Sequence, residues 1–223
     1  MVERENRRGA SKLDIPGVSP WEVMAIATGA VAIVTLGLLG LSLKAITNAF
    51  DPTRAQAIAQ NLVDYTIPGG STGGFGLNLG GIKVALVGSS ALVSTLTAPE
   101  QVTQQLPDGV MLRVTRLPID RLARPEDFEA VNFSNHFGIT FAHENLEIYR
   151  SYQEDKVLCG FTVPITIQTG SLTLTEAAPA TPAVQYEVNL TFGNYQRLFV
   201  ITGFGRNAQA EVEQVFQSLR CNR

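Results

Sequence analysis

The chain has 223 residues, of which 45% are hydrophobic and 17% are charged, and its formal net charge at pH 7 is −3. This composition excludes a mainly disordered chain, and 17 Lys and Arg against 20 Asp and Glu leave no positive excess for binding nucleic acid. Two cysteines and two histidines are too few for a metal cage or a fold built on disulfides, so we expect one ordinary domain with additional segments and no cofactor.

Residues 23–43 give the strongest signal in the sequence. This run, VMAIATGAVAIVTLGLLGLSL, carries no charge, and at about 1.5 Å per residue it is long enough to cross a hydrocarbon core of roughly 30 Å. Trp21 and Lys44 bracket it at positions where interfacial residues are common. The apolar part of a cleaved signal peptide is shorter, about 7–15 residues, so we expect a retained transmembrane helix after a tail of residues 1–22.

Positive charge is concentrated on the N-terminal side of this span. Arg4, Arg7, Arg8 and Lys12 precede it, whereas only Lys44 and Arg54 follow it closely. Because Lys and Arg accumulate in cytoplasmic segments, we expect the tail in the cytoplasm and the rest of the chain beyond a plasma or thylakoid membrane, in the periplasm or lumen.

Small residues recur along the span at near-helical spacing, at Ala25, Gly29, Ala32 and Gly40. Close packing of two helices inside lipid needs such a face, which suggests contact with another transmembrane helix. The alternative is that these positions reflect only the ordinary abundance of Gly and Ala in membrane helices.

The residues just before the span allow a second interpretation. Gly17 followed by Val18, and Glu22 at the fifth position after Gly17, resemble the processing site of a type IV prepilin. In that case cleavage follows Gly17, and Glu22 pairs with the N-terminal amine of a neighbouring subunit in a filament. Proline instead of Lys or Arg before Gly17, and the interruption of the long helix at Pro52, argue against a pilin.

The pattern beyond the span predicts an α+β domain over residues 51–221. Asp51 and Pro52 are typical of a helix start, and apolar spacing predicts a helix over residues 52–65. Asn207 is expected to cap a closing helix whose apolar stripe ends at Leu219. Between these helices, β-branched and aromatic runs predict strands at residues 75–79, 82–87, 110–117, 146–149, 157–168, 171–175, 184–192 and 197–202. An antiparallel sheet flanked by an N-terminal and a C-terminal helix is the expected architecture.

Three connections are also expected. Gly80 and Gly81 have the turn chemistry of a tight hairpin. Residues 118–152 follow no clear period and are interpreted as an irregular insertion, with a short helix start near Arg124. Residues 177–183, with the sequence AAPATPA, are expected to form a loop.

Several of these segments resemble a bacterial, cyanobacterial-type family of single-pass membrane proteins of unknown function. DPTRAQAIAQNLVDYTIPGG (51–70) and GFGLNLGGIKVALV (74–87) match an anchor, then a helix ending in a D-Y/I-x-L/I-P-x-G pattern, then a hairpin. VPITIQTGSLTLTEA (163–177) and YEVNLTFGNYQRLFVITGFG (186–205) are similar to the family's paired strands before its final helix. The layout is also similar to the photosystem II extrinsic P-subunit fold, as an architectural analogy that carries no function.

Cys159 and Cys221 are the only thiols in the sequence. Outside the cytoplasm a disulfide between them is permitted, and it would tie the end of the closing helix to a predicted strand that carries Cys159. Such a bridge closes a loop of about 60 residues, worth roughly 4 kcal/mol in the chain-entropy account. The alternative is two unpaired cysteines.

The other reactive residues fit no catalytic or metal-binding signature. His136 and His143 lie seven apart on an extended segment, so their rings point to opposite faces and do not assemble a zinc site. The glycine-rich residues 69–81 lack the Lys-Ser/Thr of a phosphate-binding loop and are expected to permit turns. The sequons at Asn132 and Asn189 matter only in a eukaryotic secretory context.

We therefore expect a membrane-anchored, non-enzymatic accessory, interaction or assembly factor of a membrane complex. Its partners would be the lipid bilayer and membrane proteins. Two alternatives remain: a pilin-like subunit, and a membrane-tethered ligand-binding or hydrolytic domain. The sequence does not decide whether the chain is an enzyme, although the absence of a catalytic pattern favours a non-enzyme.

Overall fold

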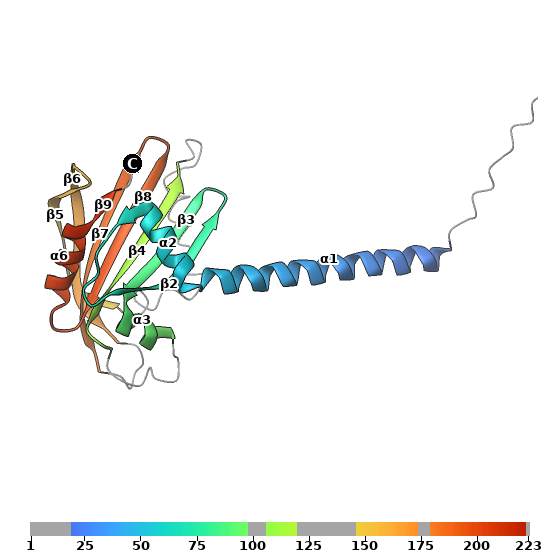
Figure 1. Cartoon of the computed structure of the whole chain (residues 1–223), viewed down its shortest axis with the longest axis horizontal. Helices are drawn as coiled ribbons and strands as arrows, with labels where there is room; N and C mark the ends of the chain where they lie inside the picture. Colours follow the sequence, from blue (N-terminus) through green and yellow to red (C-terminus); the bar gives the residue numbers. More distant parts are fainter. Residues whose placement is uncertain (1–18, 98–105, 120–145, 174–178, 222–223) are drawn as a thin grey trace, which may run out of the picture. The chain divides into compact units, whose positions relative to one another are not determined.

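The computed structural model describes residues 19–97, 106–119, 146–173 and 179–221. The chain divides into two units, Met1–Ala45 and Ile46–Arg223. The first contains most of a single long helix, and the second contains a sheet with helices packed on it (Figure 1). The expected insertion near Arg124, both histidines and the sequon at Asn132 lie outside the described residues.

Helix α1 (Pro20–Ala49) extends beyond the predicted span of residues 23–43 at both ends, and further at its C-terminal end. It begins with proline at the first helical position, and the Glu22 carboxylate accepts a hydrogen bond from the Ser19 backbone N–H at 3.0 Å. This is half of a capping box, which satisfies a backbone donor ahead of the first turn. The helix continues past Lys44 because no proline or glycine follows before Pro52. Pro52 disfavours helical geometry at Asp51, so the helix ends just before it.

Helix α2 (Pro52–Leu62) begins as the sequence predicts. Asp51 is extended, and its carboxylate accepts hydrogen bonds from the backbone N–H groups of Thr53 (2.9 Å) and Arg54 (3.4 Å). The Thr53 hydroxyl donates to the same carboxylate at 2.6 Å, and this hydrogen bond, followed by the two backbone ones, lowers the pKa of the Asp51 carboxyl. The helix ends at Leu62 rather than residue 65, because Val63 turns extended and begins the short strand β1 (Val63–Asp64).

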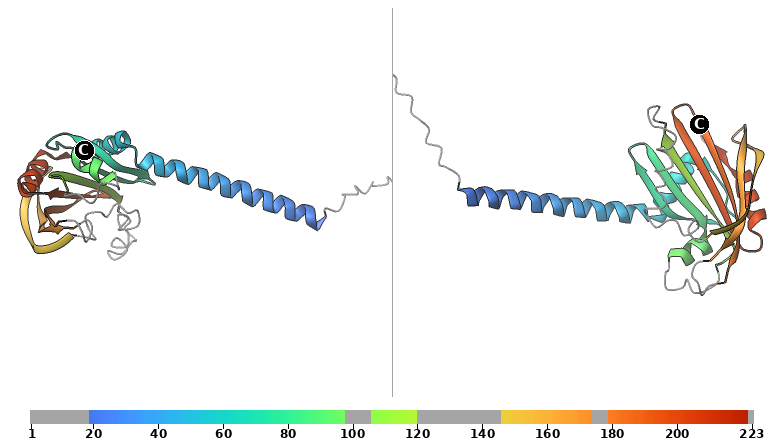
Figure 2. Two further views of the ribbon diagram at one scale, coloured as in Figure 1. Left: turned by 90° about the horizontal axis from the view of Figure 1, so that it is seen from below. Right: turned by 180° about the vertical axis from the view of Figure 1, so that it is seen from behind.

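A seven-stranded antiparallel sheet forms the centre of the second unit, as predicted. Its order is β2-β3-β4-β8-β7-β6-β5, so β2 and β5 are the edge strands (Figures 1 and 2). The strands are β2 (Ser71–Leu79), β3 (Ile82–Ser89), β4 (Gly109–Pro118), β5 (Leu146–Leu158), β6 (Phe161–Leu172), β7 (Thr181–Phe192) and β8 (Tyr195–Phe204).

The boundaries of three predicted elements were wrong. The strand predicted at residues 146–149 is present but does not end there: residues 150–152 are not irregular, since β5 is one strand from Leu146 to Leu158. Strands were predicted at residues 157–168 and 171–175, with a break between them. The break lies earlier, between the end of β5 at Leu158 and the start of β6 at Phe161, and β6 continues to Leu172 while paired with β5 and β7. The loop over residues 177–183 ends earlier than expected, since β7 begins at Thr181.

Three short elements were missed. α3 (Ser90–Thr97) follows β3 directly, and β1 pairs with β9 (Arg220–Cys221) in a separate two-stranded sheet. A two-residue strand has no detectable period, so only the tertiary pairing reveals it. The closing helix α6 (Ala208–Ser218) is present, but the Asn207 side chain makes no capping hydrogen bond, contrary to expectation.

The larger hydrophobic core lies between the sheet and helices α2 and α6, which share one face of it. Buried side chains of the helices, such as Leu62 and Val215, meet buried strand residues such as Leu112 and Phe199. Leu92 of α3 lies in a smaller core with Met111, which alternates with Leu112 along β4. Side chains alternate between faces along a strand, so this smaller core lies on the opposite face of the sheet.

Two glycines of β2 set how closely α2 approaches the sheet. A Cβ at Gly73 would lie 2.1 Å from the Pro52 carbonyl oxygen, and one at Gly76 would lie 2.7 Å from the Ala55 Cα. Only glycine fits under a helix backbone at these distances. The glycine-rich segment is therefore a packing surface for α2, whereas Gly80 and Gly81, with φ of 58° and 89°, supply the predicted hairpin turn.

Candidate functional site

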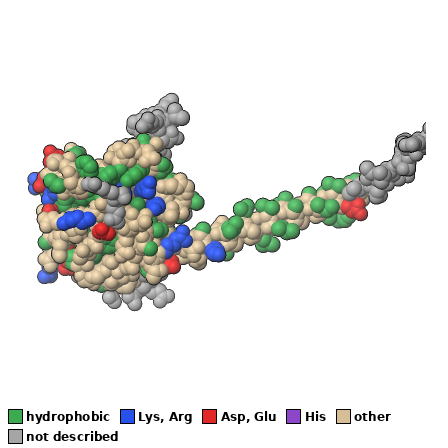
Figure 3. All heavy atoms as spheres, turned by 45° about the horizontal axis from the view of Figure 1, so that its top comes forward, with side chains coloured by type: hydrophobic (Ala, Val, Ile, Leu, Met, Phe, Trp, Pro, Cys, Tyr) green, Lys and Arg blue, Asp and Glu red, His purple; other side chains and the backbone are tan. Residues whose placement is uncertain are grey.

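Helix α1 has the surface of a helix in lipid. Its large apolar side chains between Trp21 and Ile46 are 52–74% exposed, and hydrophobic side chains cover it along its length (Figure 3). The hydroxyls of Thr28, Thr35 and Ser42 each donate to the backbone carbonyl four residues earlier at 2.8 Å. The polar groups of the span are thus satisfied within the helix, as a hydrocarbon environment requires. Within the described residues, α1 is the one helix long and apolar enough to cross a membrane.

The predicted small-residue face maps onto one side of α1. At about 100° per residue, Ala25, Gly29, Ala32 and Gly40 fall within an arc of roughly 80°, although Leu36 lies inside the same arc. No neighbouring group lies within 4 Å of a Cβ placed at Gly29 or Gly40. The helix–helix contact stays a prediction.

The structure describes only one of the two residues of the prepilin interpretation, which stays a prediction. Gly17 lies outside the described residues, and Glu22 accepts the Ser19 hydrogen bond within its own helix. The carboxylate at this position therefore has a local role in starting α1.

The structure joins Cys159 and Cys221 by a disulfide, with Cα atoms 5.3 Å apart. Cys159 was expected on a strand, but it lies in the two-residue turn between β5 and β6. Cys159 and Gly160 have φ of 55° and 84°, the left-handed pair of a tight hairpin turn. The disulfide and the β1–β9 pairing together fasten the C-terminal segment to the start of the domain and to this turn.

A pocket of about 470 Å³ adjoins the disulfide. It lies between the end of α6 and the β5–β6 turn, and its walls include Val157, Phe216, Gln217, Arg220 and both cysteines. The Arg220 guanidinium donates to the carbonyls of Gln217 (2.8 Å) and Leu219 (2.9 Å), so it is occupied in closing the last turn of α6.

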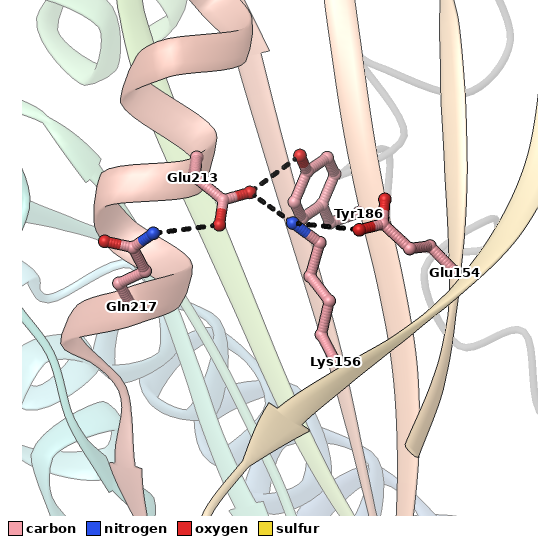
Figure 4. Close-up of polar contacts among 5 residues, drawn as sticks. All are labelled: Glu154, Lys156, Tyr186, Glu213 and Gln217. Carbon is pink, nitrogen blue, oxygen red and sulfur yellow. Dashed lines mark hydrogen bonds and ion pairs between the residues drawn. The ribbon is translucent and has the colours of Figure 1, made fainter. Parts of the chain in front are cut away.

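A polar cluster joins α6 to the sheet near this pocket (Figure 4). The Glu213 carboxylate accepts hydrogen bonds from Lys156 Nζ (2.7 Å), the Tyr186 hydroxyl (2.9 Å) and Gln217 Nε2 (3.0 Å). Lys156 Nζ also lies 3.8 Å from a Glu154 oxygen and 5.4 Å from the centre of the Tyr186 ring. The cluster therefore connects edge strand β5, strand β7 and helix α6.

The electrostatics of this cluster fit a structural role. Burial raises the pKa of the Tyr186 hydroxyl, and the hydrogen bond and charge of Glu213 raise it further. Burial alone would also raise the pKa of the Glu213 carboxyl, but hydrogen bonds from Lys156, Gln217 and Tyr186 outweigh it and the pKa is lowered. A protonated tyrosine and a carboxylate held by three donors are poorly suited to proton transfer near neutral pH. The cluster thus holds β5 against α6.

The described residues contain no group of three or more His, Cys, Asp or Glu side chains positioned to hold a metal ion. Sequence reasoning did not identify the Glu213 cluster, because its members lie on three elements. Lys156 and Glu213 are 57 positions apart, and no local spacing connects them.

Comparisons with known proteins give a likeness in structure but none in sequence family. No protein family matches the chain, so the cyanobacterial-type family stays a prediction, and no curated protein matches it either. The chain is similar to LpqN, a protein involved in cell envelope biogenesis of Mycobacterium tuberculosis, with 10% sequence identity and a TM-score of 0.37. The likeness covers 76% of this chain and 96% of LpqN. The chain itself contains a candidate membrane helix and an α+β domain whose C-terminal segment is held by a disulfide.

Proposed function

We propose that this chain is a single-pass membrane protein whose α+β domain lies outside the cytoplasm and works through contacts with proteins of a membrane complex. Helix α1 is the observation that carries the proposal. It contains a stretch with a mean hydropathy of 2.2 whose large apolar side chains are exposed. Water would disfavour that apolar surface strongly, whereas lipid solvates it.

Two features support the proposed side of the membrane. The basic residues before the span favour a cytoplasmic tail. Disulfides persist in oxidising compartments such as the periplasm, and the domain's two cysteines are joined in one.

The contact role is supported by how the domain uses its polar groups. The clusters at Glu213 and Arg220 serve the packing of α6, and the β1–β9 pair and the disulfide hold the C-terminus. Ile148, Tyr149, Val157 and Phe161 are large apolar side chains that stay 45–68% exposed along or beside β5. Ile148 and Tyr149 lie near one end of β5, and Val157 and Phe161 lie at the other, so both ends of this edge expose apolar groups that a partner could cover.

Membrane extraction and protease protection test the anchor and its orientation. The full chain, tagged at either end, is expected to stay with membranes after alkaline carbonate washing. Protease added to the outer side of intact spheroplasts is expected to remove the C-terminal tag and spare the N-terminal one. Release by carbonate, or digestion of the domain only after the cytoplasmic side is opened, contradicts the proposal.

Purification in mild detergent tests the contact role. Stoichiometric protein partners are expected to copurify with the full chain, and to be lost when exposed residues of the domain are changed to charged ones. A preparation that contains this chain alone, from cells expressing it at its natural level, contradicts a role as a complex component.

A further inference from the structure

Strand β5 is a long edge strand of the sheet. It is 13 residues long, forms one end of the strand order and pairs only with β6 among the described strands. Most of its residues are exposed, with Leu146, Tyr152 and Lys156 half-buried and Leu158 buried. The outward N–H and C=O groups of such a strand are a template for another strand.

Charges on β5 restrict which strand can add to this edge. Arg150, Glu154 and Lys156 lie on the face of β5 that is directed toward α6. Lys156 donates to Glu213 of α6, and Arg150 lies 5.0 Å from the ring centre of Tyr152, on the same face. Charged residues on an edge normally oppose pairing with an arbitrary strand. A strand that carries both signs still accepts a partner with the complementary order.

A second β5 offers that complementary order in one register only. In an antiparallel pair, a residue whose backbone N–H and C=O point toward the partner strand lies opposite a residue of the same kind. Such residues alternate along β5, so the two-fold axis relating two copies of the regular stretch 150–158 passes through a residue and not between two residues. Centring on Tyr152 places Arg150 opposite Glu154 of the second copy, twice by symmetry. Glu147 and the exposed Asp155 are then not opposed by a like charge.

The neighbouring registers place like charges together. Centring on Gln153 opposes Arg150 and Lys156, and centring on Glu154 or Asp155 opposes each of these carboxylates to its own copy. Centring on Lys156 opposes two ammonium groups. Centring on Ser151 pairs only three residues before the bulge between Ile148 and Arg150 interrupts the ladder.

We propose that β5 is a self-association edge, on which a second copy of this chain adds antiparallel with Tyr152 at the two-fold centre and Arg150 paired with Glu154 of the other copy. The same arrangement carries the exposed Ile148 of each copy to the end of the strand where Val157 of the other is exposed. This dimer does not depend on the cellular partners proposed above, and its test is separate from theirs.

Charge reversal on the full-length protein in mild detergent tests the pairing. Light scattering across a concentration series is expected to show a dimer for the natural chain. R150E and E154R each place like charges opposite one another twice and are expected to weaken the dimer about tenfold or more. The double variant R150E/E154R restores opposite charges and is expected to recover the dimer. R54E, a reversal on exposed Arg54 of α2, is the matched control and is expected to dimerise normally.

Cysteine crosslinking tests the register. Residues directly opposite in an antiparallel pair have Cα atoms about 4.5–5.5 Å apart, within disulfide range, so Tyr152→Cys is expected to crosslink two copies. Asp155→Cys is expected not to, because the two positions lie roughly 20 Å apart in this register. Thermal melting of each variant establishes that the domain is folded.

Four results would overturn the proposal. They are a natural chain that is monomeric at every concentration, a dimer that survives both single reversals, folded single variants that the double variant does not rescue, and crosslinking at Asp155→Cys as efficient as at Tyr152→Cys.

Discussion

Replacing Gly76 with alanine tests whether β2 is built to receive α2. The added Cβ would lie 2.7 Å from the Ala55 Cα, 3.1 Å from the Ala55 nitrogen and 3.1 Å from the Ile58 Cδ1. Ordinary contacts begin near 3.4 Å, so α2 must move outward by several tenths of an ångström along its buried face. Overpacking of this kind costs about 1–3 kcal/mol, and we expect a loss of about 2 kcal/mol for Gly76→Ala.

Thermal unfolding of the full chain in detergent, followed by circular dichroism, measures this effect. For a domain of this size each kcal/mol corresponds to about 2–4 °C, so the melting temperature of Gly76→Ala is expected to fall by about 4–8 °C. Gly74→Ala is the matched control, because its Cβ would meet Leu86 only at 3.7 Å. Gly74→Ala should change the stability by no more than about 0.5 kcal/mol. Equal melting of Gly76→Ala and the natural chain, or equal losses at Gly74 and Gly76, would refute the reasoning.

Three further measurements check the disulfide, the polar cluster and the N-terminus. Cys221→Ser removes a disulfide that spans 62 positions, and it is expected to lower the free energy of unfolding by roughly 4 kcal/mol. Cys159→Asn should lose about 1 kcal/mol less, because Asn tolerates the left-handed conformation of residue 159 better than most residues. Equal denaturant midpoints for the two variants would contradict this difference. Glu213→Gln is expected to lower the free energy of unfolding by about 1–2 kcal/mol at pH 7. The pKa of Glu213 is lower in the folded protein than its ordinary value of 4.5, so the ionised carboxylate stabilises the fold above that value. The difference in free energy of unfolding between the variant and the natural chain should therefore disappear as the pH falls below 4.5 and through the lowered pKa. Glu211→Gln, whose pKa burial and Asp108 raise, is the control and should not destabilise at pH 7; a loss matching that of Glu213→Gln would count against the cluster. Mass spectrometry of the purified protein is expected to find an intact tail, whereas a chain beginning at Val18 would support the pilin alternative.

Local pattern was sufficient for the elements whose burial is regular. An uncharged apolar run predicts α1, Asp51 and Pro52 predict the start of α2, and Gly80-Gly81 predicts the first hairpin. Each of these depends on neighbours within a few residues. The same local pattern failed where exposed strand residues follow no apolar period, and for this reason residues 150–156 of β5 were not predicted as strand.

The contacts that define the candidate surfaces come from residues far apart in the chain. Gly76 lies under Ala55, Lys156 meets Glu213, and β1 pairs with β9. The order of strands also makes β5 an edge, although it falls in the middle of the sequence. Sequence by itself determined a long apolar helix and an α+β domain, because the length of an apolar run and its periodicity are local properties. Only the tertiary structure decided which strands lie at the edges of the sheet and which glycines are crowded, because these depend on distances between segments that no local spacing encodes.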